Sequence, residues 1–178
     1  MLASTGTMVT KRKNKNPSYG NVHVCKDETL VGVVLNRNYG FGFNHKATRF
    51  GVDTYNDNPC EETFKGPHPF SENETKAVRD FVFDHVNQLR FVYNFHSFGN
   101  MYLYPFNALK SEHLNELYPQ YKNLFEEIAS LTPQGDEVGH SIEFLDYTAT
   151  GEASDWILAA TGIPAVSPEI GSIDPDTR

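Results

Sequence analysis

Short apolar runs alternate with polar, turn-rich stretches along this chain, and their spacing predicts both strands and helices. We expect strands where apolar, aromatic or β-branched residues run together, at 30–35, 89–95, 141–147 and 163–166. Apolar residues at helical spacing predict helices at about 72–88, 114–131 and 152–161. Strands that alternate with helices are typical of an α/β fold.

Local signals mark where some of these elements begin and end. The sequence Ser71-Glu72-Asn73-Glu74 predicts a capping box, with Ser71 as the N-cap of the first helix. Gly162 is expected to end the last helix. Residues 36–70 are rich in Gly, Asn, Asp and Pro and predict a long ordered loop, a kind of segment that often carries function.

The amino-acid composition limits the kinds of molecule that this chain can have as binding partners. With 178 residues and 39% hydrophobic content, the chain can form one domain with a real core. Its net charge of -8 argues against nucleic acid or an anionic membrane as the main partner. No apolar run is long enough for a membrane span. We expect residues 1–10 to form an irregular lead-in before the folded part.

Two features bear on the cellular compartment. Cys25 and Cys60 permit one disulfide, and composition leaves open whether it forms. Asn73-Glu74-Thr75 matches a glycosylation sequon, although such triplets also arise by chance. Together they favour an oxidising compartment of the secreted or lysosomal type.

Polar and ionisable residues follow the predicted strands. Asn36 and Arg37 come directly after the first, His96 after the second, and Glu169 after the last. Ligands of open α/β sheets bind beyond the carboxyl ends of strands, and the planar fork of an arginine suits a carboxylate. Asn36-Arg37-Asn38 therefore predicts an anion pocket, although the same triplet is common in ordinary polar loops.

Several longer sequence motifs follow one another along the chain. They are Lys11-Arg12-Lys13-Asn14, Gly32 to Asn38, Pro59 to Gly66, Pro69 to Thr75, Phe95 to Phe98, Leu103 to Phe106, and Tyr147 through Asp155-Trp156 to Glu169. From about Lys11 onward the chain resembles the zinc carboxypeptidase family, of the pancreatic carboxypeptidase A and B type.

The resemblance implies a fold, an activity and a cofactor. The fold is a twisted mixed β-sheet with helices on both faces, to which residues 11–178 contribute a partial catalytic domain. The activity is zinc-dependent hydrolysis of the C-terminal peptide bond, with peptide C-termini as substrate. Cys25 and Cys60 match positions that pair in the pancreatic enzymes, which implies a disulfide that braces the long loop.

Three residues match the family's chemical groups. His96 matches the third zinc ligand, Glu169 the general base and acid, and Arg12 the group that stabilises the developing oxyanion. Without the resemblance, His96 could equally be a hydrogen-bonded core histidine. Glu169 could be a solvated loop carboxylate, and Arg12 one more member of a basic run.

Other residues match the family's substrate-binding groups. Asn36 and Arg37 match the pair that grips the terminal carboxylate, and Tyr147 matches the mobile phenol that closes over the substrate. The matching side-chain pocket would draw on Asn107, Ile142, Ala149, Ser154 and Ser167. Because the base of this pocket, at Ser154, is not acidic, we expect an apolar or mixed preference rather than C-terminal Lys or Arg.

Two departures from the family pattern concern the metal. The family's first zinc motif, His-x-x-Glu, lies upstream of the Arg-Lys-Asn segment, and we expect this chain to lack that part. Val34 stands where most relatives have an Asp that orients a zinc histidine. The strings His113 to Glu116 and His140 to Glu143 lie elsewhere and are interpreted as coincidences, the second on or beside a strand.

Two functional hypotheses follow. The first is a zinc metallocarboxypeptidase of which this chain is a truncated part, inactive by itself because His96 supplies only one of three expected ligands. The second is a catalytically inactive carboxypeptidase-like domain that serves as a structural or carboxylate-binding subunit, with other chains of a larger assembly as partners.

Overall fold

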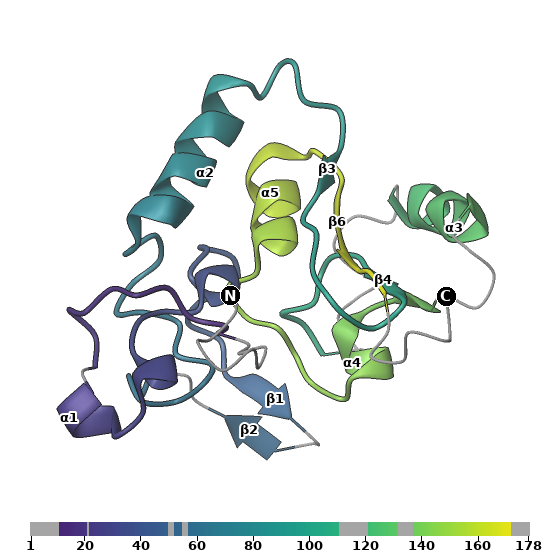
Figure 1. Cartoon of the computed structure of the whole chain (residues 1–178). Coiled ribbons are helices and arrows are strands. Elements are labelled where there is room, and N and C mark those ends of the chain that lie inside the picture. Colours follow the sequence, from purple (N-terminus) through teal and green to yellow (C-terminus); the bar gives the residue numbers. More distant parts are fainter. Residues whose placement is uncertain are drawn as a thin grey trace.

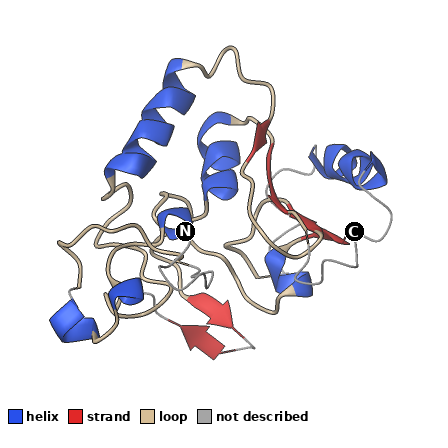
Figure 2. Ribbon diagram, viewed as in Figure 1, coloured by secondary structure: helices blue, strands red, loops and turns tan. Residues whose placement is uncertain are grey.

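The computed structural model describes residues 11–20, 22–49, 52–54, 57–110, 121–131 and 137–171. Figure 1 and Figure 2 show short helices and strands joined by long connections. The helices are α1 (Val22–Cys25), α2 (Asn73–Asp84), α3 (Lys122–Leu131), α4 (Ser141–Phe144) and α5 (Ala153–Thr161), with 3-10 turns η1 (Glu28–Leu30) and η2 (Leu35–Arg37). The strands are β1 (Ala47–Arg49), β2 (Val52–Thr54), β3 (Val92–Tyr93), β4 (Met101–Leu103), β5 (Glu137–Gly139) and β6 (Ala165–Glu169).

A four-stranded mixed sheet in the order β3-β6-β4-β5 organises the fold. Strand β6 runs parallel to β3 and antiparallel to β4, and β4 runs parallel to β5. Helices α2 and α5 lie on one side of these strands and α3 on the other (Figure 1). The expected mixed α/β architecture is confirmed. No helix in the described ranges is long and apolar enough to cross a membrane.

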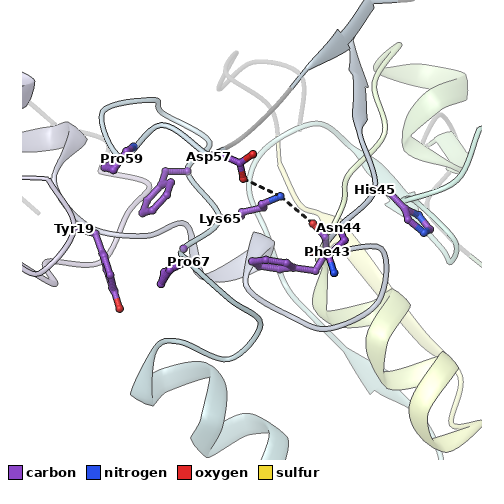
Figure 3. A pocket seen from close by; sticks show the side chains of 10 residues that line it. Tyr19, Phe43, Asn44, His45, Asp57, Pro59, Lys65 and Pro67 are labelled. Carbon is purple, nitrogen blue, oxygen red and sulfur yellow. Dashed lines mark hydrogen bonds and ion pairs between the residues drawn. The ribbon is translucent and has the colours of Figure 1, made fainter.

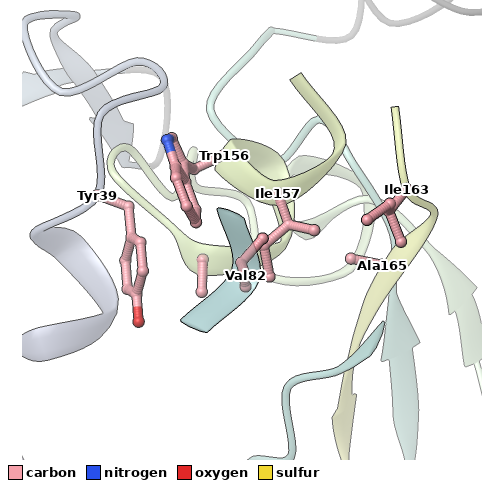
Figure 4. Close-up of a cluster of buried hydrophobic side chains, with 7 residues drawn as sticks. Tyr39, Val82, Trp156, Ile157, Ile163 and Ala165 are labelled. Atoms are coloured by element: carbon pink, nitrogen blue, oxygen red, sulfur yellow. The ribbon is translucent and has the colours of Figure 1, made fainter. Parts of the chain in front are cut away.

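The core lies between α2, α5 and the sheet (Figure 4). Its buried members are Tyr39, Val82, Ala153, Trp156, Ile157, Ile163 and Ala165. Burial raises the pKa of the Tyr39 phenol to about 12. Each fully buried large side chain contributes roughly 1.5–3 kcal/mol, so this cluster fixes α5 firmly against β6.

All three predicted helices are confirmed in their described parts. Helix α5 ends at Gly162, whose φ of 73° is left-handed and whose N–H donates to Leu158 O at 2.9 Å. Helix α3 covers the end of the predicted 114–131 helix, and its Phe125 stacks on Tyr104 at 4.6 Å between ring centroids. The first part of that prediction, and the string His113 to Glu116, lie outside the described residues.

Three strand predictions need correction. The run 30–35 forms no strand, because the Val33 carbonyl bonds Asn14 and the Val34 N–H bonds Phe64, which belong to different segments. In the run 89–95 only β3 forms, at the edge of the sheet, and Tyr93 is 51% exposed rather than buried. The central strand β4 and the β1–β2 hairpin were not predicted from the apolar pattern.

The run 141–147 is a helix at its start, not a strand. The Glu143 carboxylate accepts the His140 N–H at 2.8 Å and so closes the first turn of α4. The strand lies just before it, as β5. The string His140 to Glu143 therefore has a structural role as a helix start.

The long loop 36–70 is largely irregular, as expected, apart from the antiparallel β1–β2 hairpin. The implied disulfide between Cys25 and Cys60 is present and closes a separation of 35 residues. Beside it, the buried Lys13 ammonium donates to Pro59 O at 2.6 Å and Glu61 O at 3.1 Å. These bonds hold the segment that carries Arg12 against the loop.

Helix α2 (Asn73–Asp84) confirms the helix predicted at about 72–88, although it ends four residues earlier, and the capping prediction is wrong. Glu72 rather than Ser71 is the N-cap, and the Ser71 hydroxyl donates to Glu72 Oε1 at 2.7 Å. The amides of Asn14 and Asn16 both donate to Glu72 Oε2 at 2.8 Å. Glu72 is 1% exposed, so its carboxylate ties the N-terminal segment to the start of α2.

Replacing this carboxylate should change both stability and its pH dependence. Burial alone would raise the pKa of Glu72, yet the bonds from Asn14, Asn16 and Ser71 together lower it. A lowered folded-state pKa adds stability that is present above the ordinary Glu value of about 4.3 and is lost as pH falls through the folded value. We expect Glu72→Gln to cost about 1–3 kcal/mol at pH 7 in urea unfolding, and less at pH 3.

The exposed Glu127 on α3 offers a matched control. Glu127→Gln should leave the unfolding free energy within about 0.5 kcal/mol of wild type at both pH values. An equal loss for Glu72→Gln at pH 7 and pH 3 would contradict the role given to the Glu72 charge.

Candidate active site

The carboxyl ends of β3 and β6 bring His96 and Glu169 together. The two residues pair in a parallel bridge, with His96 N donating to Pro168 O at 2.8 Å and Ile170 N to His96 O at 3.0 Å. Asn36, in η2, reaches the same place, because its amide nitrogen lies 3.0 Å from His96 Nε2. Three of the predicted site residues therefore meet at one end of the sheet.

His96 is held as a neutral imidazole. The amide nitrogens of Asn36 and Asn94 each lie 3.0 Å from Nε2. Asn36 Oδ1 accepts the Ala153 N–H at 3.0 Å, which turns the donating NH₂ group towards the ring. Nε2 thus accepts hydrogen bonds, and the ring proton belongs on Nδ1. Burial lowers the pKa of His96, and the Arg37 and Arg12 charges lower it further against Glu152.

Two arginines supply positive charge to this region. Arg37 is buried, and its Nη1 donates to the Asn36 carbonyl at 2.6 Å. Loss of hydration lowers the pKa of Arg12, and so does the nearby Arg37 charge, while Tyr147, Glu62 and Glu169 act in the opposite direction. Two guanidinium groups this close repel each other, and a bound anion would relieve that repulsion.

Glu169 is a half-buried carboxylate whose pKa is raised. Burial raises its pKa, and the Glu152 charge raises it further, whereas Arg12 and Arg37 oppose both effects. A carboxyl group whose pKa moves towards neutrality suits proton transfer. Glu169 is the last residue of β6, so a rigid strand positions it.

Tyr147 belongs to the same region. It is half-buried and pairs with Arg49 of the β1–β2 hairpin in an isolated antiparallel bridge. Its side chain interacts with the Arg12 charge. The hairpin thus holds the backbone of Tyr147 at Arg49.

Most of the predicted side-chain pocket forms one buried network. Ser154 Oγ lies 2.5 Å from Ser167 Oγ, and Asn107 accepts bonds from Ser141 N at 2.8 Å and Ala149 N at 2.6 Å. Asn107, Ser154 and Ser167 are at most 1% exposed. Ile142 lies next to Ser141 in α4 and is half-buried, and no described contact joins its side chain to this network.

Two acidic residues complete this network, and sequence reasoning gave neither a place in the site. Glu152 is 3% exposed, and it accepts Asn107 Nδ2 at 2.8 Å and the Ser167 hydroxyl. Asp155 accepts the Asn107 N–H at 2.9 Å and the Ala108 N–H at 2.7 Å. Burial raises the pKa of Asp155 well above its usual value, and the Glu152 charge adds to the effect.

Asn94 was also missed, and here the sequence held a signal. It stands two residues before His96, so along an extended strand both side chains point to the same face. For Glu152 the only signal was its place as the first residue of the predicted 152–161 helix, which does not say where the side chain points.

The described residues do not by themselves form a zinc centre. Among them, no group of three or more His, Cys, Asp or Glu side chains could hold a metal ion together. His96 Nε2 is moreover contacted by two amide groups. The role of His96 as a ligand therefore stays a prediction, as do the catalytic and binding roles of the other residues.

A surface pocket of about 500 Å³ lies apart from these residues (Figure 3). Phe43, Phe64 and Lys65 are among its walls. The Lys65 ammonium lies 3.0 Å from Asp57 Oδ1 and donates to Phe43 O at 3.0 Å. None of the predicted site residues lines this pocket, and its one ion pair ties two parts of the long loop together.

Comparison with known proteins identifies the family. The sequence profile of the zinc carboxypeptidases matches residues 3–174, and the chain belongs to this family. Carboxypeptidase A4 of Mus musculus is 34% identical over 148 residues, which cover 82% of this chain and 31% of the relative. Carboxypeptidase B of Astacus astacus is 27% identical over 154 residues, covering 85% and 46%.

A solved structure and a further sequence relative agree with this assignment. Carboxypeptidase A from Helicoverpa armigera superposes with a TM-score of 0.64 at 27% identity, over 91% of this chain and 37% of that one. Mast cell carboxypeptidase A of Rattus norvegicus is 28% identical over 84% of this chain and 32% of its own length. The chain thus spans about a third of the length of such relatives.

Gly151 allows its loop to pack directly against the backbone of Arg37. Gly151 has a φ of 70°, and a Cβ there would lie 2.3 Å from the Arg37 carbonyl oxygen. We expect Gly151→Ala to destabilise the protein by about 2–5 kcal/mol, because strain and a backbone clash add together. Thermal unfolding would measure the loss.

Gly171 provides a matched control for this glycine. Its φ is 80°, and a Cβ there would meet nothing within 4 Å. Gly171→Ala should therefore cost only about 1 kcal/mol, from backbone strain alone. Equal losses for the two variants would refute the close approach at Arg37.

Proposed function

We propose that the full-length protein to which this chain belongs is a zinc-dependent metallocarboxypeptidase that hydrolyses the C-terminal peptide bond of peptides. Family membership supports a carboxypeptidase-type function. The observation that carries the proposal is the convergence of Asn36, Arg37, Arg12 and Glu169 around His96. This arrangement combines an anion site with a group suited to proton transfer.

Asn36 and Arg37 would bind the terminal carboxylate of the substrate. Arg37 uses one Nη1 bond on the Asn36 carbonyl, and the rest of its planar fork remains for a ligand. An internal peptide bond carries no carboxylate at this point, so binding here would restrict cleavage to the chain end. Tyr147 would close over the bound residue.

Glu169 and Arg12 would serve the reacting atoms. Glu169 would take a proton from the attacking water and return it to the leaving amine, a task that its raised pKa suits. Arg12 would stabilise the negative charge that develops on the carbonyl oxygen. His96 would give one nitrogen to zinc once the Asn36 and Asn94 amides release Nε2, with the other ligands coming from residues outside the described ranges.

A specific observation favours the second candidate, an inactive carboxypeptidase-like subunit. The two amides at His96 Nε2 give the ring a satisfied structural environment, and Val34 cannot orient a zinc histidine. Asn36 and Arg37 would then read peptide tails without cleaving them. Because the described residues lack a complete ligand set, we expect no turnover from the chain as given under either proposal.

The compartment is proposed to be oxidising, of the secreted or lysosomal type. The Cys25–Cys60 disulfide supports this, because such bonds persist mainly outside the cytosol.

Metal content and turnover of the full-length protein test the proposal. We expect about one zinc per molecule by mass spectrometry and release of the terminal residue from a blocked dipeptide. Glu169→Gln should lower kcat by about 10²–10⁴-fold, since a positioned general base contributes that much. Glu127→Gln should retain wild-type activity.

Two results would overturn this reading in different ways. A full-length protein without zinc and without activity leaves the inactive subunit as the function. An active protein whose Glu169→Gln variant keeps full activity refutes the assignment of the base.

The carboxylate clamp has its own test. Arg37→Lys keeps the charge but removes the planar fork, so we expect KM for a free-acid dipeptide to rise about 10- to 100-fold. Wild-type protein should not hydrolyse the same dipeptide as its C-terminal amide. Comparable rates on acid and amide would show that Arg37 does not select the chain end.

A further inference from the structure

The sequence Asn73-Glu74-Thr75 has the pattern that N-linked glycosylation requires, and the proposed function gives no role to Asn73. Asn73 is the first residue of α2, which lies at the edge of the molecule in Figure 1. Its side chain is exposed, and among the described residues it has no hydrogen-bond partner. The Asn73 amide is therefore accessible and takes no part in holding the fold.

A second triplet of similar form provides an internal contrast. In Asn16-Pro17-Ser18 the middle proline breaks the pattern, and the Asn16 amide donates to Glu72 Oε2 at 2.8 Å. Of the 178 residues of the chain, only Asn73 lies in a complete sequon. The one asparagine with the required neighbours is thus also one whose amide the fold does not use.

Thr75 supplies the hydroxyl of the sequon, and folding buries it. The side chain is 1% exposed, and Oγ1 lies 2.8 Å from Asn38 Oδ1 and 3.0 Å from Glu72 O. An enzyme that recognises this hydroxyl can reach it only before α2 packs against the loop that carries Asn38. Because Asn73 itself stays exposed after folding, the folded protein can carry the attached sugar without rearrangement.

We propose that Asn73 carries an N-linked oligosaccharide, attached before α2 folds. The donor is a lipid-linked oligosaccharyl diphosphate. A bond forms between Asn73 Nδ2 and C1 of the first sugar, and the bond between C1 and the phosphate oxygen breaks. The lipid diphosphate leaves, and one Nδ2 proton passes to a base of the transferring enzyme.

This proposal rests on the oxidising compartment proposed above, which the Cys25–Cys60 disulfide supports. It holds equally for an active enzyme and for an inactive subunit. It also limits how the rest of the full-length protein can pack. A glycan is bulky and belongs at a solvent-exposed surface, so neither the segments outside this chain nor a partner can cover the start of α2.

Full-length protein produced in cultured animal cells tests the inference. We expect digestion with a peptide N-glycanase to leave an aspartate at position 73, which peptide mass spectrometry detects. Before digestion, Asn73→Gln should migrate as one glycan smaller than wild type, and after digestion the two should migrate together. Asn73→Gln keeps an amide at an exposed position, so circular dichroism should show an unchanged fold.

Two variants serve as matched controls. Thr75→Ser keeps the hydroxyl of the sequon and should retain the glycan. Asn87→Gln changes an exposed asparagine that lies outside any sequon, and it should migrate like wild type before and after digestion.

Each outcome decides the matter. Protein with an intact Cys25–Cys60 disulfide but an unmodified Asn73 overturns the inference and leaves the proposed compartment standing. Protein that stays in the cytosol with both cysteines reduced and Asn73 unmodified overturns both. Equal mobility of wild type and Asn73→Gln before digestion likewise contradicts a glycan at this position.

Discussion

The side chain of Asn36 is the interaction on which the candidate site depends. Its oxygen accepts the first N–H of α5 at 3.0 Å and an Asn94 amide proton at 3.2 Å, while its nitrogen contacts His96. One amide thereby joins η2, α5 and the segment after β3. The residue expected to hold the substrate is thus also a structural joint, so the site is rigid before any ligand arrives.

Charges of both signs act on the candidate site. Burial and the Glu152 charge raise the pKa of Glu169, whereas Arg12 and Arg37 lower it, and the upward effects prevail. Burial and the Glu152 charge likewise raise the pKa of Asp155, which lies in the first turn of α5.

Sequence patterns predicted those parts of the fold that local signals determine. Helix α5 has apolar spacing and a glycine end, and both are found. The run 30–35 failed because burial and extension of Val33 and Val34 do not require a strand; their hydrogen bonds go to two separate segments. Glu152 was missed because its side-chain direction follows from the packing of α5, which no local pattern encodes.

A crystal structure of the full-length protein with a bound peptide tests the account most directly. We predict that the terminal carboxylate of the peptide contacts Asn36 and Arg37. A terminal carboxylate bound elsewhere would contradict the account.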